Sequence, residues 1–149
     1  MVEVTARYEG GLHCQVHHGP SGAEFGTDAP TDNHGKGEAF SPTDLVGAGI
    51  AACTLTIMAI SAESHGIDLR GATAVTRKEM STDAPRRIVR LSTMITLPLS
   101  ADHPKRPMLE QAARGCPVHK SISAEIDAPI EFTWAGEPAA RAAAAPARP

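Results

Sequence analysis

The stretch FSPTDLVGAGIAACTLTIMAISAESHG, residues 40–66, decides the fold of this chain. Ser41 is a favourable N-cap, Pro42 suits the first helical position, and Asp44 lies where a carboxylate can meet exposed N–H groups. The apolar side chains that follow cover nearly every angle of a helix, and His65 precedes a glycine that can end it. We therefore predict a helix from Pro42 to His65, roughly 36 Å long at ~1.5 Å per residue. Because it has no polar face, this helix is expected to be buried on all sides.

The segments on either side of this helix predict strands and one further helix. Alternating or β-branched runs predict the strands, because such runs suit a pleated surface with one buried face. The predicted strands cover residues 2–6, 12–18, 23–27, 71–80, 88–97 and 129–134. A second helix is predicted over residues 107–116, where Pro117 breaks it. This order of elements predicts an α+β fold with largely antiparallel sheets packed around a long buried central helix.

The overall composition excludes several classes of protein. The 149 residues predict a single domain, and 14 Lys and Arg against 17 Asp and Glu, without a basic block, exclude a nucleic-acid surface. No apolar run approaches the ~20 residues that cross a bilayer, so we expect no membrane association. The first residues do not form a secretory signal, which predicts a cytoplasmic protein. The few aromatic side chains leave a small core, of a kind that a second subunit often completes.

The C-terminal segment has a different composition from the rest of the chain. Seven of its fourteen residues, 136–149, are Ala, three are Pro and two are Arg. Such a segment has little apolar surface to bury, and we expect it to be disordered. The predicted working domain therefore covers residues 1–135, followed by an Ala/Pro/Arg-rich tail at 136–149.

The chain contains three cysteines, Cys14, Cys53 and Cys116. Because this number is odd, a structural disulfide framework is not expected. If two of the cysteines act as a pair, redox chemistry is the better interpretation. Cys53 lies in the middle of the apolar helix, where a cysteine is also a common small buried hydrophobe. Cys116 lies at the break before Pro117, and an imidazolium of the nearby His119 would favour its thiolate. Cys116 can equally be the last apolar position of a short helix. The two form a disulfide only if the helices pack with Cα atoms within ~7 Å.

The other polar clusters offer little chemistry. Neither the Cys and His residues at 14–18 nor those at 116–119 supply three or four metal ligands at a familiar spacing, so we expect no metal. Residues 35–37, Gly-Lys-Gly, lack the rest of a phosphate loop, and no Gly-x-Ser-x-Gly elbow is present. Neither nucleotide binding nor serine hydrolase chemistry is therefore indicated.

Three motifs together resemble a known family. They are Phe40-Ser41-Pro42-Thr43-Asp44-Leu45, Gly49-Ile50-Ala51-Ala52-Cys53 and Cys116-Pro117-Val118-His119-Lys120-Ser121. The motifs and the separation of the two cysteines resemble the signature of the OsmC/Ohr family of thiol-dependent hydroperoxide reductases, over about residues 1–135. The resemblance implies an intertwined homodimer in which two long helices are buried between sheets and the active sites lie at the subunit interface.

The resemblance also implies a reaction. Cys53 is then the peroxidatic nucleophile: its thiolate attacks an organic, lipid-like hydroperoxide, releases the alcohol and becomes a sulfenic acid. Cys116 resolves this sulfenic acid by forming a Cys53–Cys116 disulfide. An external dithiol or lipoyl-type reductant restores the thiols, and no bound cofactor is expected. The implied role is defence against oxidative stress.

The activating Glu and Arg of the best-characterised family members have no obvious counterparts here. The Glu position near the start of the long helix is matched by Thr43, with Asp44 beside it. The N-terminal region contains Arg7, although Glu9 falls nearer the position of the family Arg. Thr43, Asp44, Arg7 and His119 are therefore the candidate supporting residues. Without that pair, a second hypothesis stays open: a non-enzymatic OsmC-like module that binds a small hydrophobic ligand or senses oxidation at the dimer interface.

Overall fold

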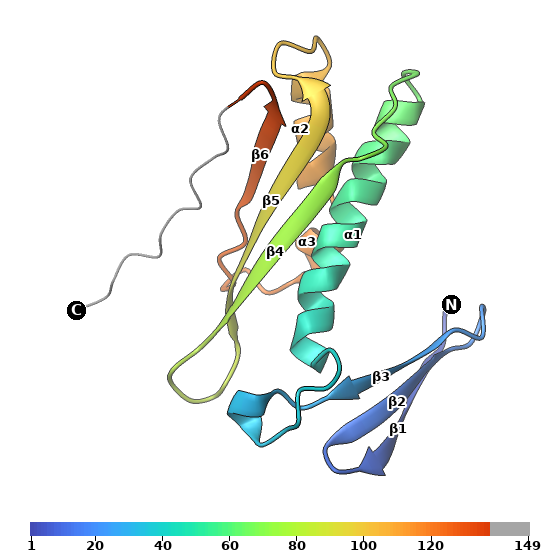
Figure 1. The fold of residues 1–149 in the computed structure, drawn as a ribbon, viewed down its shortest axis with the longest axis vertical. Helices are drawn as coiled ribbons and strands as arrows, with labels where there is room; N and C mark the ends of the chain where they lie inside the picture. Colours follow the sequence, from blue (N-terminus) through green and yellow to red (C-terminus); the bar gives the residue numbers. More distant parts are fainter. Residues whose placement is uncertain (138–149) are drawn as a thin grey trace. The chain divides into compact units, whose positions relative to one another are not determined.

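The computed structural model describes residues 1–137 of the chain (Figure 1). The described part of the chain forms two compact units, divided between Val46 and Gly47. Each unit contains one three-stranded sheet, and the long helix begins in the first unit and continues into the second. Two sheets with a long helix confirm the α+β class that the sequence predicts.

The first unit is built on an antiparallel sheet of order β1-β2-β3. Its strands are β1 (Val4–Gly10), β2 (His13–His18) and β3 (Glu24–Asp28), close to the predicted ones. The β1–β2 turn passes through Gly10 and Gly11, whose φ angles of 92° and 58° lie in the left-handed region that glycine tolerates best. The loop after β3, predicted to be irregular, contains one short 3-10 helix, η1 (Thr31–Asn33).

The sheet of the first unit has one apolar and one polar face. The strand register places on the mainly apolar face Val4, Ala6, Tyr8, Cys14, Val16 and Phe25, together with His18 and Thr27. The polar face carries Thr5, Arg7, His13, Gln15, His17, Glu24 and Asp28. Within the chain, Val4, Tyr8 and Phe25 are 59%, 63% and 44% exposed. An apolar sheet face left this open is of the kind that another protein surface covers.

Helix α1 (Pro42–Glu63) starts at the predicted residue. The Ser41 N–H donates to Asp44 Oδ2 at 2.8 Å, and the Asp44 N–H donates to Ser41 Oγ at 3.2 Å. This reciprocal cap satisfies N–H groups that have no partner within a helix and so fixes the first turn. The helix ends slightly before the predicted His65, and Gly66 follows in the left-handed conformation with φ 68°.

The second unit is built on a sheet of order β4-β5-β6. Its strands are β4 (Thr73–Met80), β5 (Ile88–Ser100) and β6 (Ile130–Ala135). β4 and β5 are antiparallel, as are the strand pairs of the first unit, whereas β5 and β6 are parallel. The chain between β5 and β6 crosses through α2 (Arg106–Arg114) and α3 (Pro117–Ser121), and such a crossover is what joins parallel neighbours. The prediction of largely antiparallel sheets therefore holds with one exception.

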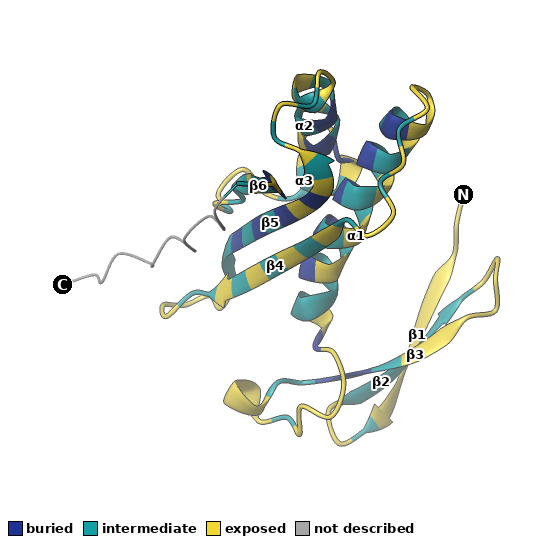
Figure 2. Cartoon of the chain, turned by 45° about the horizontal axis from the view of Figure 1, so that its top comes forward, coloured by how far each residue is buried: buried dark blue, intermediate teal, exposed yellow. Residues whose placement is uncertain are grey.

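The core of the second unit lies between β5 and two helices. Alternate β5 residues are buried, Leu91, Thr93, Ile95 and Leu97, and they form the face that the sequence predicts. The main cluster joins β5 to α1, α2 and β6 through Met58, Ala62, Ile95, Leu97, Leu109, Ala113 and Trp134. Figure 2 shows buried positions alternating with less buried ones along β5 and recurring on successive turns of α1. One face of the sheet is therefore covered by α1 and α2.

Helix α1 buries one stripe and exposes the opposite one. The buried stripe is Gly47, Ile50, Thr54, Met58 and Ala62, and the exposed stripe is Ala48, Ala52, Thr56 and Ile60. A single chain therefore does not bury α1 on all sides, and the predicted burial of the exposed stripe by a second subunit stays a prediction. By length and composition α1 is also long enough to cross a membrane, contrary to the prediction from apolar runs, although a core helix of a soluble protein passes the same test.

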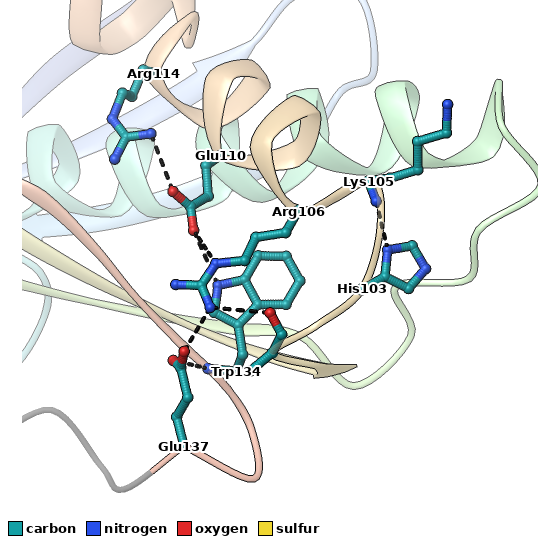
Figure 3. Close-up of polar contacts among 8 residues, drawn as sticks. His103, Lys105, Arg106, Glu110, Arg114, Trp134 and Glu137 are labelled. Atoms are coloured by element: carbon teal, nitrogen blue, oxygen red, sulfur yellow. Dashed lines mark hydrogen bonds and ion pairs between the residues drawn. The ribbon is translucent and has the colours of Figure 1, made fainter.

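A polar cluster ties α2 to β6 (Figure 3). Arg106 pairs with Glu110 at 2.9 Å and with Glu137 at 2.6 Å, and its guanidinium lies 5.1 Å from the Trp134 ring centroid. The Trp134 indole N–H donates to Glu110 Oε1 at 3.2 Å, and the Trp134 backbone N–H donates to Glu137 Oε2 at the same distance. The indole N–H and the backbone N–H of the buried Trp134 therefore both have a carboxylate acceptor. Of the predicted tail, residues 136 and 137 are described, and the rest of that prediction lies outside the described residues.

Replacement of Leu109 tests the core of the second unit. Leu109 is fully buried between α2 and the sheet, so Leu109→Ala is expected to lower the free energy of unfolding by about 2–5 kcal/mol. Urea unfolding followed by far-ultraviolet circular dichroism measures the change. Gln111→Ala, at an exposed position of the same helix, is the matched control and should change stability little. Equal effects of the two changes would contradict the described packing.

Candidate functional site

The second unit brings Cys53 and Cys116 together. Cys53 lies midway along α1 and is partly exposed, whereas Cys116 is fully buried at the start of α3. The two thiols are close enough to shift each other's pKa, and both are free cysteines. The helix packing that the sequence could not establish is therefore present. Two thiols in contact can exchange a proton or, after oxidation, form a disulfide.

The local sequence around Cys116 aims its sulfur inward. Cys116 is the N-cap of α3, with φ −52° and ψ 122°, and Pro117 occupies the first helical turn. The sulfur accepts a hydrogen bond from the His119 N–H at 3.5 Å. The predicted helix break is thus present, but the chain immediately begins a new short helix, α3, that was not predicted. Pro117, which suits the first turn of a helix, was the sequence feature that could have indicated α3.

Two further residues that the sequence analysis did not identify lie beside the cysteines. The backbone N–H of Val118 is close to both sulfurs, and the fully buried Thr54, next to Cys53 on α1, donates its hydroxyl proton to the Ile50 carbonyl oxygen at 2.7 Å. Val118 packs over Gly49, where an added Cβ would lie 3.8 Å from Val118 Cγ1. Helix α3 therefore packs on α1 one turn before Cys53. The position of Thr54 next to Cys53 was the available signal for Thr54.

The surroundings separate the pKa values of the two thiols. Burial raises the pKa of the Cys53 thiol, and the hydrogen bond with Cys116 raises it further. Burial acts in the same direction on Cys116, but the neighbouring Cys53 thiol and the His119 N–H outweigh it and lower the pKa of Cys116.

The His119 side chain anchors α3 to the segment before β6. Its Nε2 lies 2.8 Å from the Ala128 carbonyl oxygen. Because a carbonyl can only accept, Nε2 is the protonated nitrogen and Nδ1 of the neutral ring carries the lone pair. Nδ1 is buried and has no hydrogen-bond partner within residues 1–137. The neighbouring Asp127 and Pro129 carbonyls accept from Leu91 and Thr93 N–H groups, so His119 ties Cys116 to the sheet.

The remaining predicted residues belong to the first unit. Arg7 pairs with Glu9 at 2.5 Å, and its side chain is 80% exposed. Thr43 Oγ1 lies 3.0 Å from Ser41 Oγ, and Asp44 caps α1. Cys14 lies on β2 as a free cysteine. The contribution of Arg7, Thr43 and Asp44 to the site stays a prediction.

The described residues offer no second chemical centre. Within residues 1–137 no group of three or more His, Cys, Asp or Glu side chains could hold a metal ion. A hollow of about 560 Å³ lies where α1 ends and the chain runs on towards β4. Its apolar lining is Leu55, Ala59, Ile67, Leu69 and Ala72, with the charged residues Glu63, Asp68 and Arg70. Neither cysteine lines this hollow, so it is separate from the thiol pair.

The family model for the OsmC-like protein matches residues 35–131. The chain belongs to the OsmC-like protein family. The match covers α1, both cysteines of the thiol pair and α3, so the resemblance noted in the sequence is confirmed. A comparison with curated proteins finds no match.

Solved structures share the fold of this OsmC-like chain. A Psychrobacter arcticus protein, named for osmotic stress induction and a detoxification response, is 40% identical, with 89% of this chain and 96% of that chain covered and a TM-score of 0.83. A Legionella pneumophila protein named as an organic hydroperoxide resistance protein is 17% identical, with 89% and 96% covered and a TM-score of 0.73. A Vibrio cholerae protein named for the same resistance, with captopril bound in one active site, is 19% identical, with 87% and 90% covered and a TM-score of 0.70. At these lower identities the similarity shows the OsmC-like fold.

Chemical oxidation tests the contact between the cysteines. Diamide treatment of the reduced protein is expected to give an intrachain Cys53–Cys116 disulfide and to leave Cys14 as a thiol, because the first two sulfurs are in contact. Peptide mass spectrometry identifies the linked cysteines. Cys14→Ser serves as the matched control and should form the same disulfide. A main product linked through Cys14 would contradict the described pair.

Proposed function

We propose that this OsmC-like protein is a cysteine-based peroxidase that reduces organic, lipid-like hydroperoxides to alcohols in defence against oxidative stress. The observation that carries the proposal is the proximity of the Cys53 and Cys116 thiols, with the His119 N–H donating to the Cys116 sulfur. Two cysteines in contact are the minimum that a two-thiol peroxidase requires. Family membership supports the same class of chemistry.

In the proposed reaction Cys53 is the peroxidatic residue and Cys116 the resolving one. The Cys53 thiolate attacks a peroxide oxygen, the O–O bond breaks, and the sulfur becomes a sulfenic acid as the alcohol leaves. Cys116 then attacks the oxidised sulfur and forms the disulfide. Cys53 suits the first step because it is partly exposed, whereas Cys116 is fully buried. An external dithiol or lipoyl-type reductant would return both residues to thiols.

The surroundings of Cys53 support an organic substrate. Helix α1 carries no charged side chain between Asp44 and Glu63, and Val118 packs over the neighbouring Gly49. An apolar approach to the sulfur favours a hydroperoxide with a hydrocarbon group over hydrogen peroxide, because burial of that group contributes about 25 cal/mol per Å². The composition of α1 therefore supports this substrate class.

The proposal includes a homodimer in the cytoplasm. A single chain leaves two apolar surfaces open, the Val4, Tyr8 and Phe25 face of the first sheet and the Ala48–Ile60 stripe of α1. Small residues along this stripe allow two helices to approach closely. A second copy of the chain would bury both surfaces and complete the small core.

An OsmC-like binding module is the second candidate function. The hollow of about 560 Å³ beside Leu55 and Leu69 has the size and apolar lining of a small-ligand site. This function does not require the thiol pair, since neither cysteine lines the hollow. Loss of peroxide consumption on cysteine replacement therefore separates the two functions.

Peroxide consumption tests the enzymatic function directly. With cumene hydroperoxide and a dithiol, the protein should turn over repeatedly, whereas Cys53→Ser should consume no peroxide because the nucleophile is absent. Thiol loss, alcohol release and disulfide mass are the measurements. Cys14→Ser is the matched control and should retain the parent rate. Consumption by the parent no faster than by Cys53→Ser would refute the peroxidase proposal.

Sedimentation tests the proposed homodimer. The protein should sediment with twice its chain mass, and Ile60→Lys should shift the equilibrium towards monomer because a charge would enter an apolar contact. Gln111→Lys, at an exposed α2 position, is the control and should leave the mass unchanged. A folded parent protein that stays monomeric at all concentrations would exclude this assembly.

A further inference from the structure

We propose that His119 is a positioning residue for the step in which Cys116 resolves the oxidised Cys53. The inference rests on the proposed peroxidase function and assigns the residue that holds the resolving sulfur in place. The backbone N–H of His119 donates to the Cys116 sulfur, and its ring is bonded to the segment before β6. One residue therefore connects the resolving sulfur to the second sheet.

The backbone of His119 fixes the Cys116 sulfur relative to α3. The N–H donates to Sγ at 3.5 Å, and Cys116 is the N-cap of this helix. An N-cap side chain that accepts from the first turn is held in one orientation by that bond. Helix α3 has only five residues, and a helix this short is not stable through its own hydrogen bonds. The position of the sulfur therefore depends on the contacts that hold α3.

The ring of His119 attaches α3 to the edge of the second sheet. Its Nε2–H donates to the Ala128 carbonyl oxygen at 2.8 Å. The carbonyls of the two residues that flank Ala128 accept from β5 N–H groups at 2.9 Å each. In a parallel pair the bonds to the neighbouring strand are evenly spaced, and here the Ala128 carbonyl lies between two of them. The ring is thus attached to a stretch of backbone that β5 already fixes.

The second ring nitrogen indicates that packing alone does not explain a histidine at this position. Nδ1 is buried and has no hydrogen-bond partner within residues 1–137. A buried polar atom without a partner costs free energy that an apolar side chain of similar size would avoid. What the histidine provides, and a leucine could not, is the hydrogen bond from Nε2 to Ala128.

The resolving step is the one that requires a held sulfur. The Cys116 thiol gives up its proton, its sulfur bonds to the Cys53 sulfur, and the S–O bond of the sulfenic acid breaks. The hydroxide that leaves takes up a proton and becomes water, while Cys116 is oxidised and the sulfenic acid is reduced to the disulfide. A misplacement of about 1 Å can slow such a step about 100-fold. The first oxidation takes place at Cys53 on α1 and does not require α3 to be held.

Two replacements separate the hydrogen bond of His119 from the size of its side chain. His119→Leu removes the donor, whereas His119→Gln keeps an N–H that can reach the Ala128 carbonyl. Both retain the backbone N–H that donates to Cys116. Lys120→Ala, at the exposed neighbouring position, is the matched control. All variants carry Cys14→Ser, and circular dichroism checks that each one is folded.

Dithionitrobenzoate tests the step without peroxide. Attack by Cys53 releases one thionitrobenzoate and leaves a mixed disulfide, and attack by Cys116 on the Cys53 sulfur then forms the S–S bond and releases the second. His119→Leu should slow the second release about tenfold and leave the first at the parent rate, because α3 has lost one of its attachments. His119→Gln and Lys120→Ala should keep both rates near those of the parent. An unchanged second release in His119→Leu, equal slowing of both releases, or no recovery in His119→Gln would overturn the inference.

Cumene hydroperoxide tests the same step in the proposed reaction. With one equivalent of peroxide and dimedone present, His119→Leu should give more trapped Cys53 sulfenic acid and less disulfide than the Cys14→Ser parent, at an unchanged rate of peroxide loss. Trapping equal to that of the parent would overturn the inference and leave the peroxidase function standing. A parent that forms no sulfenic acid would refute the proposed function, and the dithionitrobenzoate rates would still decide the role of His119.

Discussion

The packing of an uncharged helix against β5 is the constraint on which the rest of the second unit depends. Ile50, Met58 and Ala62 are fully buried, so the α1 face that meets β5 is dry. A cysteine on such a helix gains a protected position and loses the solvation that would stabilise its thiolate. Any polar assistance must therefore come from an element that packs on α1. Helix α3 packs on α1 at this point, with Val118 over Gly49. The contact between α3 and α1 therefore belongs both to the core packing and to the surroundings of Cys53.

The two cysteines are held by elements of different character. Cys53 lies within a long regular helix, where backbone hydrogen bonds on both sides fix its position. Cys116 lies between two short helices, where Gly115 and Pro117 interrupt regular backbone bonding. A residue at such a junction can move its side chain with little disturbance to its neighbours, while the His119–Ala128 bond retains the segment as a whole. A fixed Cys53 and a more adjustable Cys116 suit the proposed pair, in which Cys53 reacts with the substrate and Cys116 then reacts with the oxidised Cys53.

The sequence predicted most of the fold because its strongest signals are local. The Ser41–Asp44 cap and the alternation along β5 each depend on neighbouring residues, and both are present in the structure. The parallel pairing of β6 and the exposed stripe ending at Ile60 depend on tertiary contacts, which periodicity does not encode. At the site, the residue types of Cys53 and Cys116 were informative, but their contact required the crossing of two helices. Val118 acts through its backbone N–H, so its residue type gave no strong signal.

The environment of Trp134 determines what optical measurements on this protein report. It is the only tryptophan of the chain, it is 1% exposed, and Arg106, Glu110 and Glu137 surround its indole and backbone. Its emission therefore reports the closure of α2 on β6 rather than the oxidation state of the sulfurs. Intrinsic fluorescence can follow unfolding of the second unit without interference from thiol chemistry. For the same reason it is a poor monitor of turnover, and an engineered fluorophore near α3 would be needed to follow the redox cycle by light.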